Sequence, residues 1–343
     1  MTTAADAPAL SERVGHFYQA DHTYPVDRTK VVEYARAVQD YNPVHWEDDA
    51  AAAMGYGGLV APLAFTSIPA MAANRKLLRE VVVGYSTYVQ TEEVFEQHRP
   101  VVVGEVLQTE VELTSVRRVA GRDMITITNT FVDEDGETVH TMHTTVVGVT
   151  AEEVDPRIND AVAKVIMHDV DVLSLEESAA NYVKTVRPEG QQRISTVGQT
   201  RNVGSLNFDD LNVGDQLPVH NTKVSRGDLV NYAGIAGDVN PIHWDESIAK
   251  LAGLPDVIAH GMLTLGLGAG YVSAWTGDPG AVSRYAVRLS APLIVPADGG
   301  GAIEFSGRIK SLDPETRSGV IIVGAKSGEK KVFGMATMNV RFA

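Results

Sequence analysis

The chain contains no cysteine among its 343 residues. Disulfides, thiolate metal sites and a cysteine nucleophile are therefore excluded, and the composition is in keeping with a cytoplasmic protein. No apolar run approaches the roughly 20 residues that a membrane helix needs. The first residues, MTTAADAPALSERVGHF, also lack the basic start and apolar core of a secretory signal. These absences predict a cytoplasmic protein without a membrane span.

Positive charge is scarce as well, and the formal net charge is -15. Binding a nucleic acid requires many cationic contacts, so the composition argues against that class of partner. A local pair of cations can still hold an anionic substrate group, because charges interact over only about 8 Å at physiological salt. Three pairs are candidates, although each is expected to be solvated surface: Arg75–Lys76, Arg117–Arg118 and Lys330–Lys331.

An internal repeat is the most informative feature that is present. Residues 32–63 align without gaps on residues 230–261, with eleven identities in 32 positions, including a histidine and a tryptophan in register. A second pair of landmarks follows, Arg99-Pro100 in the first copy and Ala291-Pro292 in the second. The chain is therefore predicted to be two copies of one fold.

The same order of elements is expected in both copies. In the second copy a short helix over 226–235 is followed by the turn, an apolar helix over 261–275 and four strands, at 284–295, 301–310, 319–325 and 332–342. The first copy has matching strand-like runs at 81–95, 106–116, 124–132 and 139–150. A helix with an antiparallel meander is an α+β layout. Residues 151–205 match neither copy, and we expect a connector with a helix near 173–183.

The motif Gly237-Asp238-Val239-Asn240-Pro241-Ile242-His243-Trp244 concentrates the chemistry. Helix capping accounts for Asn240 as N-cap and Pro241 at the first helical position, and Gly253 suits the end of that helix. Capping does not account for Asp238 or His243. Those two side chains are therefore candidate acid–base groups.

A second segment, Ala259-His260-Gly261-Met262, opens the apolar helix. A glycine at a helix N-terminus lets a ligand approach the backbone closely, and the free N–H groups there favour developing negative charge. Removing a proton alpha to a thioester puts such charge on the carbonyl oxygen. Gly261 is therefore a candidate oxyanion donor.

Together these motifs resemble the MaoC-like (R)-specific enoyl-thioester hydratases and dehydratases, which have the hot-dog fold. Residues 206–343 resemble the HadB-type subunit, and residues 1–150 the HadA-type subunit, of a (3R)-hydroxyacyl-ACP dehydratase. The resemblance implies an α+β double hot-dog, with two sheets joined edge to edge and a substrate tunnel between the halves.

The resemblance also implies roles. His243 would act as base at C2 and Asp238 would orient or protonate the departing hydroxyl, while the Gly261 N–H holds the thioester oxygen. Asn240 and His260 would support the turn. No metal or organic cofactor is implied. The partners would be an acyl-ACP or acyl-CoA thioester, other type II fatty acid synthase enzymes that elongate mycolic acid precursors, and, if the chain self-associates, a second copy in a homodimer.

The first copy keeps Asp40 and His45, but Pro62-Leu63 stand where the second has His260-Gly261. Proline has no N–H to donate, and leucine crowds the place that glycine leaves open. We therefore interpret Asp40 and His45 as a catalytic remnant in a half that holds the acyl chain.

Other interpretations remain open from the residues alone. They are an acyl-CoA hydratase of fatty acid breakdown, a hot-dog thioesterase, and a non-catalytic acyl-thioester binding protein. A zinc or iron site built from Asp238, His243 and His260 has suitable ligand types. It is disfavoured because a histidine at a helix start is more simply a partner for a nearby backbone or carboxylate group.

Overall fold

The protein is described by a computed structural model that covers residues 1–343, of which 10–166, 187, 190, 193–195 and 204–343 are described below. The first half holds the short elements η1 (Leu10–Arg13), β1 (Phe17–Gln19), β2 (Tyr24–Pro25), η2 (Pro43–His45), α2 (Asp48–Ala53) and η3 (Leu77–Val81). Its longer elements are α1 (Arg28–Ala37), α3 (Ser67–Lys76), β3 (Thr87–Gln97), β4 (Val106–Val119), β5 (Arg122–Val132) and β6 (Thr138–Val149).

The connecting stretch begins with η4 (Ala151–Glu153) and α4 (Arg157–Val165). The second half holds η6 (Phe208–Asp210), β7 (Gln216–Val224), α6 (Arg226–Ala236), η7 (Pro241–His243), α7 (Glu246–Leu251), α8 (Gly261–Thr276) and η8 (Pro279–Ala281). Its remaining strands are β8 (Val282–Leu289), β9 (Gly301–Asp313), β10 (Ser318–Ser327), β11 (Lys330–Lys331) and β12 (Phe333–Arg341).

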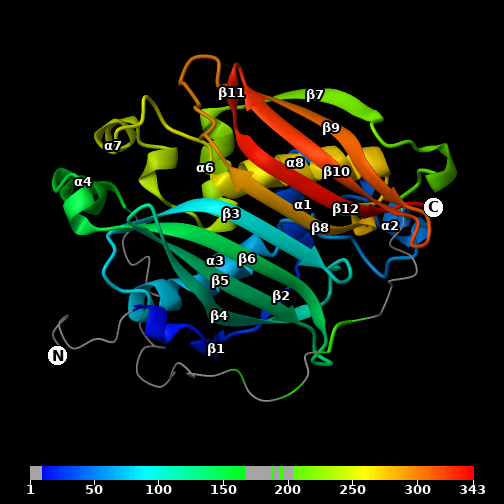
Figure 1. The fold of residues 1–343 in the computed structure, drawn as a ribbon, viewed down its shortest axis with the longest axis horizontal. Coiled ribbons are helices and arrows are strands. Elements are labelled where there is room, and N and C mark those ends of the chain that lie inside the picture. Colours follow the sequence, from blue (N-terminus) through cyan, green and yellow to red (C-terminus); the bar gives the residue numbers. More distant parts are fainter. Residues whose placement is uncertain (1–9, 167–186, 188–189, 191–192, 196–203) are drawn as a thin grey trace.

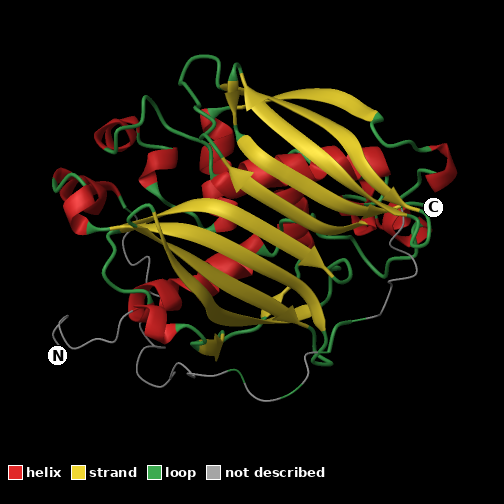
Figure 2. Ribbon diagram, viewed as in Figure 1, coloured by secondary structure: helices red, strands yellow, loops and turns green. Residues whose placement is uncertain are grey.

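The strands of both halves form one continuous antiparallel sheet in the order β1-β4-β5-β6-β3-β8-β12-β10-β9-β7. Figure 1 shows the first half's strands beside the orange and red strands of the second, with β3 next to β8. The longer helices α1, α3 and α8 lie behind the strands in this view (Figure 2). The two sheets are therefore joined edge to edge, as the sequence predicts.

An approximate twofold relation organises the seam. Val94 of β3 pairs with Ala286 of β8, and Phe95 stacks on Tyr285 with ring centroids 6.0 Å apart. On the helical side, the repeat-equivalent Tyr34 and Tyr232 lie 6.1 Å apart, centroid to centroid, and both are fully buried. Contact between equivalent positions is what an isologous, dimer-like interface requires.

Helix α8 crosses the middle of the molecule and is apolar on all sides, as expected for a helix without a wet face. Its glycines allow close packing. A Cβ on Gly266 would lie 2.5 Å from Val38 of the first half, and one on Gly268 would lie 2.6 Å from the Tyr285 hydroxyl. The central helix of the second half therefore packs directly against the first.

Some expected boundaries are wrong. The strand expected at 81–95 begins only at Thr87, because η3 occupies residues 77–81. The strand expected at 284–295 ends at Leu289, and Ile294 makes only an isolated bridge with Ile258. The turn at Asn240 opens a 3-10 turn, and Asp245 caps a separate helix, α7.

The helix expected near 173–183 lies outside the described residues, whereas α4 was not expected. Among the described residues, no helix is long and apolar enough to cross a membrane.

Candidate active site

The turn that carries Asp238 follows directly from α6. The helix ends at Gly237, whose φ of 74° is in the left-handed region that favours glycine. The Asp238 carboxylate then accepts a hydrogen bond from the Asn240 N–H (3.3 Å), and the Asn240 side chain accepts from the Ile242 N–H (3.3 Å). Asn240 thus shapes the turn that presents Asp238, and its supporting role in catalysis stays a prediction.

His243 is held in one tautomer by the backbone. Its Nδ1 lies 2.8 Å from the Ile258 carbonyl oxygen. Since a carbonyl only accepts, Nδ1 carries the proton and Nε2 keeps its lone pair. That Nε2 lies 3.9 Å from Asp238 Oδ2, and the two side chains are 8% and 26% exposed. The structure therefore brings an unprotonated imidazole nitrogen and a carboxylate to one partly open point.

The environment keeps His243 neutral. Burial lowers its pKa below 6.5, against the opposing effects of the Asp238 carboxylate and the Ile258 carbonyl. His260 stacks on it, with ring centroids 3.8 Å apart, and burial lowers the pKa of His260 to about 3. Two stacked imidazoles disfavour charge on either ring. His243 is thus poised as a base at neutral pH.

His260 also ties the two motifs together. Its Nε2 faces the Asp238 carbonyl oxygen at 3.2 Å, and the ring centroids of His260 and Tyr232 lie 4.9 Å apart. Asp238, His243 and His260 each offer a ligand atom within 4.8 Å of the others. One nitrogen of each histidine is directed at a backbone carbonyl, and zinc or iron are the metals that these ligand types would suit.

Gly261 begins α8, and no side chain caps that helix end. A Cβ at this position would lie 2.6 Å from Gln90 Oε1 and 3.3 Å from Leu289 Cδ1. Only glycine fits without displacing a neighbour. The helix N-terminus consequently presents its backbone beside the Asp238/His243 pair, and the oxyanion role of Gly261 stays a prediction.

Two residues at this site come from the first half and were missed by sequence reasoning. Gln90 of β3 lies against Gly261, and Arg75 of α3 donates to the Gly237 carbonyl oxygen (3.0 Å). Arg75 was noted only as one of three cation pairs. By contrast, Arg118 pairs with Asp123 and Lys330–Lys331 form the exposed β11. Nothing local in the sequence marks Gln90.

The first copy of the motif has the same turn and a different surrounding. His45 Nδ1 lies 2.6 Å from the Val60 carbonyl oxygen, and His45 Nε2 lies 3.2 Å from Asp40 Oδ2. These side chains are 0% and 3% exposed. The pair is in direct contact and sealed, so no hydroxyl group has room between the two partners.

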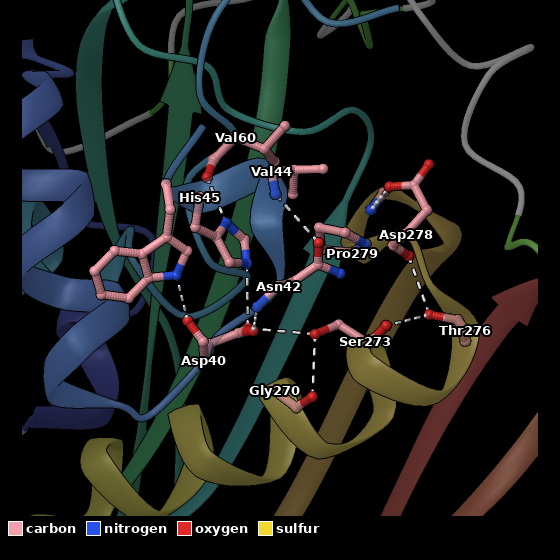
Figure 3. A network of polar contacts seen from close by, with 12 residues as sticks. Asp40, Asn42, Val44, His45, Val60, Gly270, Ser273, Thr276, Asp278 and Pro279 are labelled. Atoms are coloured by element: carbon pink, nitrogen blue, oxygen red, sulfur yellow. Dashed lines mark hydrogen bonds and ion pairs between the residues drawn. The ribbon is translucent and has the colours of Figure 1, made fainter. Parts of the chain in front are cut away.

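Helix α8 seals this pair. Ser273 donates to Asp40 Oδ2 at 3.3 Å, and a Cβ on Gly270 would meet the same carboxylate at 3.2 Å (Figure 3). Burial alone would raise the pKa of Asp40. His45 and the hydrogen bonds from Asn42 and Ser273 outweigh burial and lower it. Asp40 is thus an ionised group within the contact between the halves.

A neighbouring contact extends this polar connection. The buried Asp278 accepts from the Tyr56 hydroxyl at 2.8 Å and 3.0 Å and from the Gly280 N–H, and Asn42 donates to the Gly277 carbonyl oxygen. Leu63, at the position of Gly261, is 6% exposed in the apolar core. The first copy therefore fastens the halves together, and its assignment as a remnant stays a prediction.

Comparison with known proteins gives related families for both halves. Residues 12–142 match the profile described as "FAS1-like, dehydratase domain region", and residues 212–327 match "MaoC like domain". A UPF0336 protein of Saccharopolyspora erythraea is 33% identical over 150 residues, which are 43% of this chain and 96% of that protein.

Solved structures match the whole chain. One described as "MaoC-like dehydratase" is 66% identical with a TM-score of 0.92, and the match covers 98% of this chain and 100% of that one. A conserved hypothetical protein of Mycobacterium tuberculosis, described as having a double hot-dog fold, is 13% identical with a TM-score of 0.63 over 96% of each chain. The expected α+β double hot-dog fold is confirmed.

Proposed function

Since this chain belongs to the MaoC-like dehydratase family, we propose that it interconverts a (3R)-hydroxyacyl thioester and a trans-2-enoyl thioester. Family membership supports a hydro-lyase reaction. The proposed site is the Asp238/His243 pair with Gly261. The reaction needs no metal or organic cofactor in this account, because the thioester itself acidifies the C2 proton.

The tautomer of His243 carries the proposal. With Nδ1 donating to the Ile258 carbonyl, Nε2 is the nitrogen that accepts a proton, and Asp238 Oδ2 lies 3.9 Å away from it. A hydroxyl or water oxygen can contact both atoms at once. In dehydration His243 would take the C2 proton. Asp238 would orient the departing hydroxyl or, in its protonated form, give it the proton with which it leaves as water, because hydroxide is a poor leaving group.

The first turn of α8 would stabilise the negative charge that develops during the reaction. Loss of the C2 proton places negative charge on the thioester oxygen, and the Gly261 N–H at an uncapped helix N-terminus is a preorganised donor for it. His260 and Asn240 would hold the two motifs in register. These are supporting roles.

We assign the catalytic half to residues 206–343 and an acyl-chain-holding role to residues 1–150, joined by 151–205. The proposed substrate is a fatty acyl group on acyl carrier protein, in type II fatty acid elongation of mycolic acid precursors. The carrier is the part that rests on resemblance alone, so acyl-CoA is the alternative. Other enzymes of that synthase are the proposed partners.

The test follows the ultraviolet absorbance of a long trans-2-enoyl thioester, on ACP and on CoA, with purified protein. Wild type is expected to remove the conjugated signal, and Asp238→Asn and His243→Gln are expected to lower the rate about 10²- to 10⁴-fold. Tight enoyl-thioester binding without turnover on either carrier would contradict the proposal and favour an acyl-binding protein. Release of free thiol would favour a thioesterase.

A further inference from the structure

Strand β3 carries an irregularity beside the candidate site. Gln90 pairs with Val146 and Glu92 with Thr145, so Thr91 is an extra residue in the strand. Side chains alternate along a strand, and positions 90 and 93 would ordinarily point to opposite faces. The bulge at Thr91 returns both to the face that meets α8. Bulges next to active sites commonly re-aim a side chain in this way.

The bulge brings Gln90 and Glu93 into contact. Gln90 Nε2 lies 2.9 Å from Glu93 Oε2, and Glu93 is completely buried. A buried carboxylate without a cation nearby is costly, and burial raises the pKa of Glu93 to about 8. At neutral pH the acid is therefore mainly protonated and is itself a donor.

The other side of the Gln90 carboxamide faces the first turn of α8. Its oxygen lies 2.6 Å from where a Cβ on Gly261 would be, and its nitrogen is 3.7 Å from Met262 Sδ. The two ends of a carboxamide have the same shape, so half a turn about the last bond exchanges them without moving other atoms. Hydrogen bonding decides which end meets Gly261.

The two orientations have opposite consequences for a thioester oxygen. With nitrogen toward Glu93, an acceptor oxygen lies beside Gly261 and would repel the developing negative charge. With oxygen toward a protonated Glu93, the NH₂ group lies beside Gly261 and can donate. The second orientation also gives the Glu93 proton a partner.

We propose that Glu93 is a positioning residue that donates its carboxyl proton to Gln90 and so turns the Gln90 NH₂ group toward Gly261 as a second donor to the thioester oxygen. This inference rests on the proposed function. It makes the first half a contributor to the chemistry of the second, with Gln90 touching the substrate and Glu93 acting through it.

The groups that face Glu93 in the described part of the chain are uncharged at neutral pH. They are Thr144 of β6 and Val287 of β8, which pair with it, and Gln90. Further along the same face, burial raises the pKa of Tyr285 well above 10 and lowers that of His140 to about 3. Glu92 and Arg288 form an ion pair with each other. Glu93 ionisation is therefore the titration that should govern the Gln90 orientation.

The test measures kcat and KM against pH on the thioester that wild type turns over, for wild type, Gln90→Leu, Glu93→Leu, the double variant and Glu93→Gln. Gln90→Leu is expected to lower kcat about 100-fold, the size seen when one oxyanion donor is removed. Glu93→Leu should lose a similar factor, and the double variant should lose little more, because the two residues act as a unit.

The isosteric Glu93→Gln separates positioning from packing. Its amide NH₂ donates to Gln90 Oε1 at every pH, so it should recover most of the kcat lost in Glu93→Leu. Wild-type kcat should fall as pH rises past about 8, when Glu93 ionises, and Glu93→Gln should lose that alkaline limb. Thermal unfolding midpoints of all variants check that each is folded.

Three results would overturn the inference alone while wild type still turns over. They are a Gln90→Leu kcat within about twofold of wild type, additive losses in the double variant, or the same alkaline limb in Glu93→Gln and wild type. Absence of wild-type turnover on every carrier would overturn the proposed function and this inference together.

Discussion

The two copies of the motif are similar in sequence, but the residues that contact them from the opposite half are different. Both histidines donate Nδ1–H to a backbone carbonyl, and both face an aspartate. In the first copy Asp40 is 3.2 Å from His45 Nε2 and the pair is sealed, whereas in the second Asp238 stands 3.9 Å from His243 and is partly open. The motif alone therefore does not make an active site.

The helix from the other half makes the difference. Ser273 of α8 donates to the Asp40 carboxylate itself, but Arg75, at the matching register of α3, donates to the backbone carbonyl of Gly237. The Ser273 hydroxyl therefore occupies an oxygen of the Asp40 carboxylate, whereas Arg75 leaves the Asp238 carboxylate available to a substrate. One difference on the facing helix, serine in α8 and arginine in α3, can thus decide whether the aspartate–histidine pair joins the two halves or stays available as a candidate catalytic pair.

The largest expected contrast is in turnover. Asp238→Asn and His243→Gln should lower kcat about 10²- to 10⁴-fold, because each removes an acid–base group. Asp40→Asn and His45→Gln should leave the kcat of the folded protein within about threefold of wild type, because the pair is buried and a substrate cannot contact it. Steady-state rates per folded molecule decide it. Equal losses in both sets would mean that the first copy also catalyses.

A second contrast concerns Gly261, which opens α8, and its counterpart Leu63, which lies before α3. Gly261→Ala should lower kcat about 100-fold, because its Cβ would displace Gln90 from the first turn of α8. Leu63→Ala should instead cost about 2–5 kcal/mol of stability by leaving a cavity. Rates and urea unfolding of the two variants separate these effects. A fully active Gly261→Ala protein would show that turnover does not depend on the place of Gln90 beside the first turn of α8.

Asp40→Asn should destabilise the protein by about 2 kcal/mol at pH 7, because it removes a buried carboxylate that accepts hydrogen bonds from Asn42 and Ser273. The folded pKa of Asp40 lies below 3.8, so its contribution is present above that value and is lost as pH falls through the folded pKa. The stability gap between wild type and variant should therefore narrow in acid. Urea unfolding at several pH values measures it. A gap that is independent of pH would show that ionisation of Asp40 does not stabilise the fold.

The smallest expected effect lies at the end of the helix before each motif. Gly237 has φ of 74° and its counterpart Gln39 has φ of 53°. Gly237→Ala should cost about 1 kcal/mol, the strain of a left-handed L residue. Gln39 offsets its strain by donating to the Lys223 carbonyl oxygen across the halves, so Gln39→Gly should not stabilise. Thermal unfolding compares them. A clearly stabilised Gln39→Gly protein would show that this contact adds nothing.

Much of the fold could be predicted because its signals are local. The repeat, the alternation in residues 106–116 and the all-apolar helix at 261–275 each correspond to a structural element. Strand ends were less predictable, since residues 77–81 turn into η3 and residues 290–295 leave the sheet despite their apolar character. Periodicity does not reveal where a neighbouring strand stops.

At the site, the local part was visible and the non-local part was not. Asp238, His243 and Gly261 are marked by two short motifs, and the structure brings them together. Gln90 and Glu93 have no such mark. They reach the site only because a one-residue bulge turns the strand, and a bulge follows from pairing across the sheet.

The continuous sheet across β3 and β8 has a consequence for how the two halves can diverge. When two subunits are separate chains, their contact must be strong enough to survive dilution. Here both copies belong to one chain, so they are always present in a one-to-one ratio. Linkage also gives each copy an effective concentration, as seen by the other, on the order of millimolar. Each copy then always contacts the same partner copy, so its interface does not have to be self-complementary. Asymmetric pairs such as Glu93 opposite Val287 can accumulate at the seam without risk of a wrong pairing.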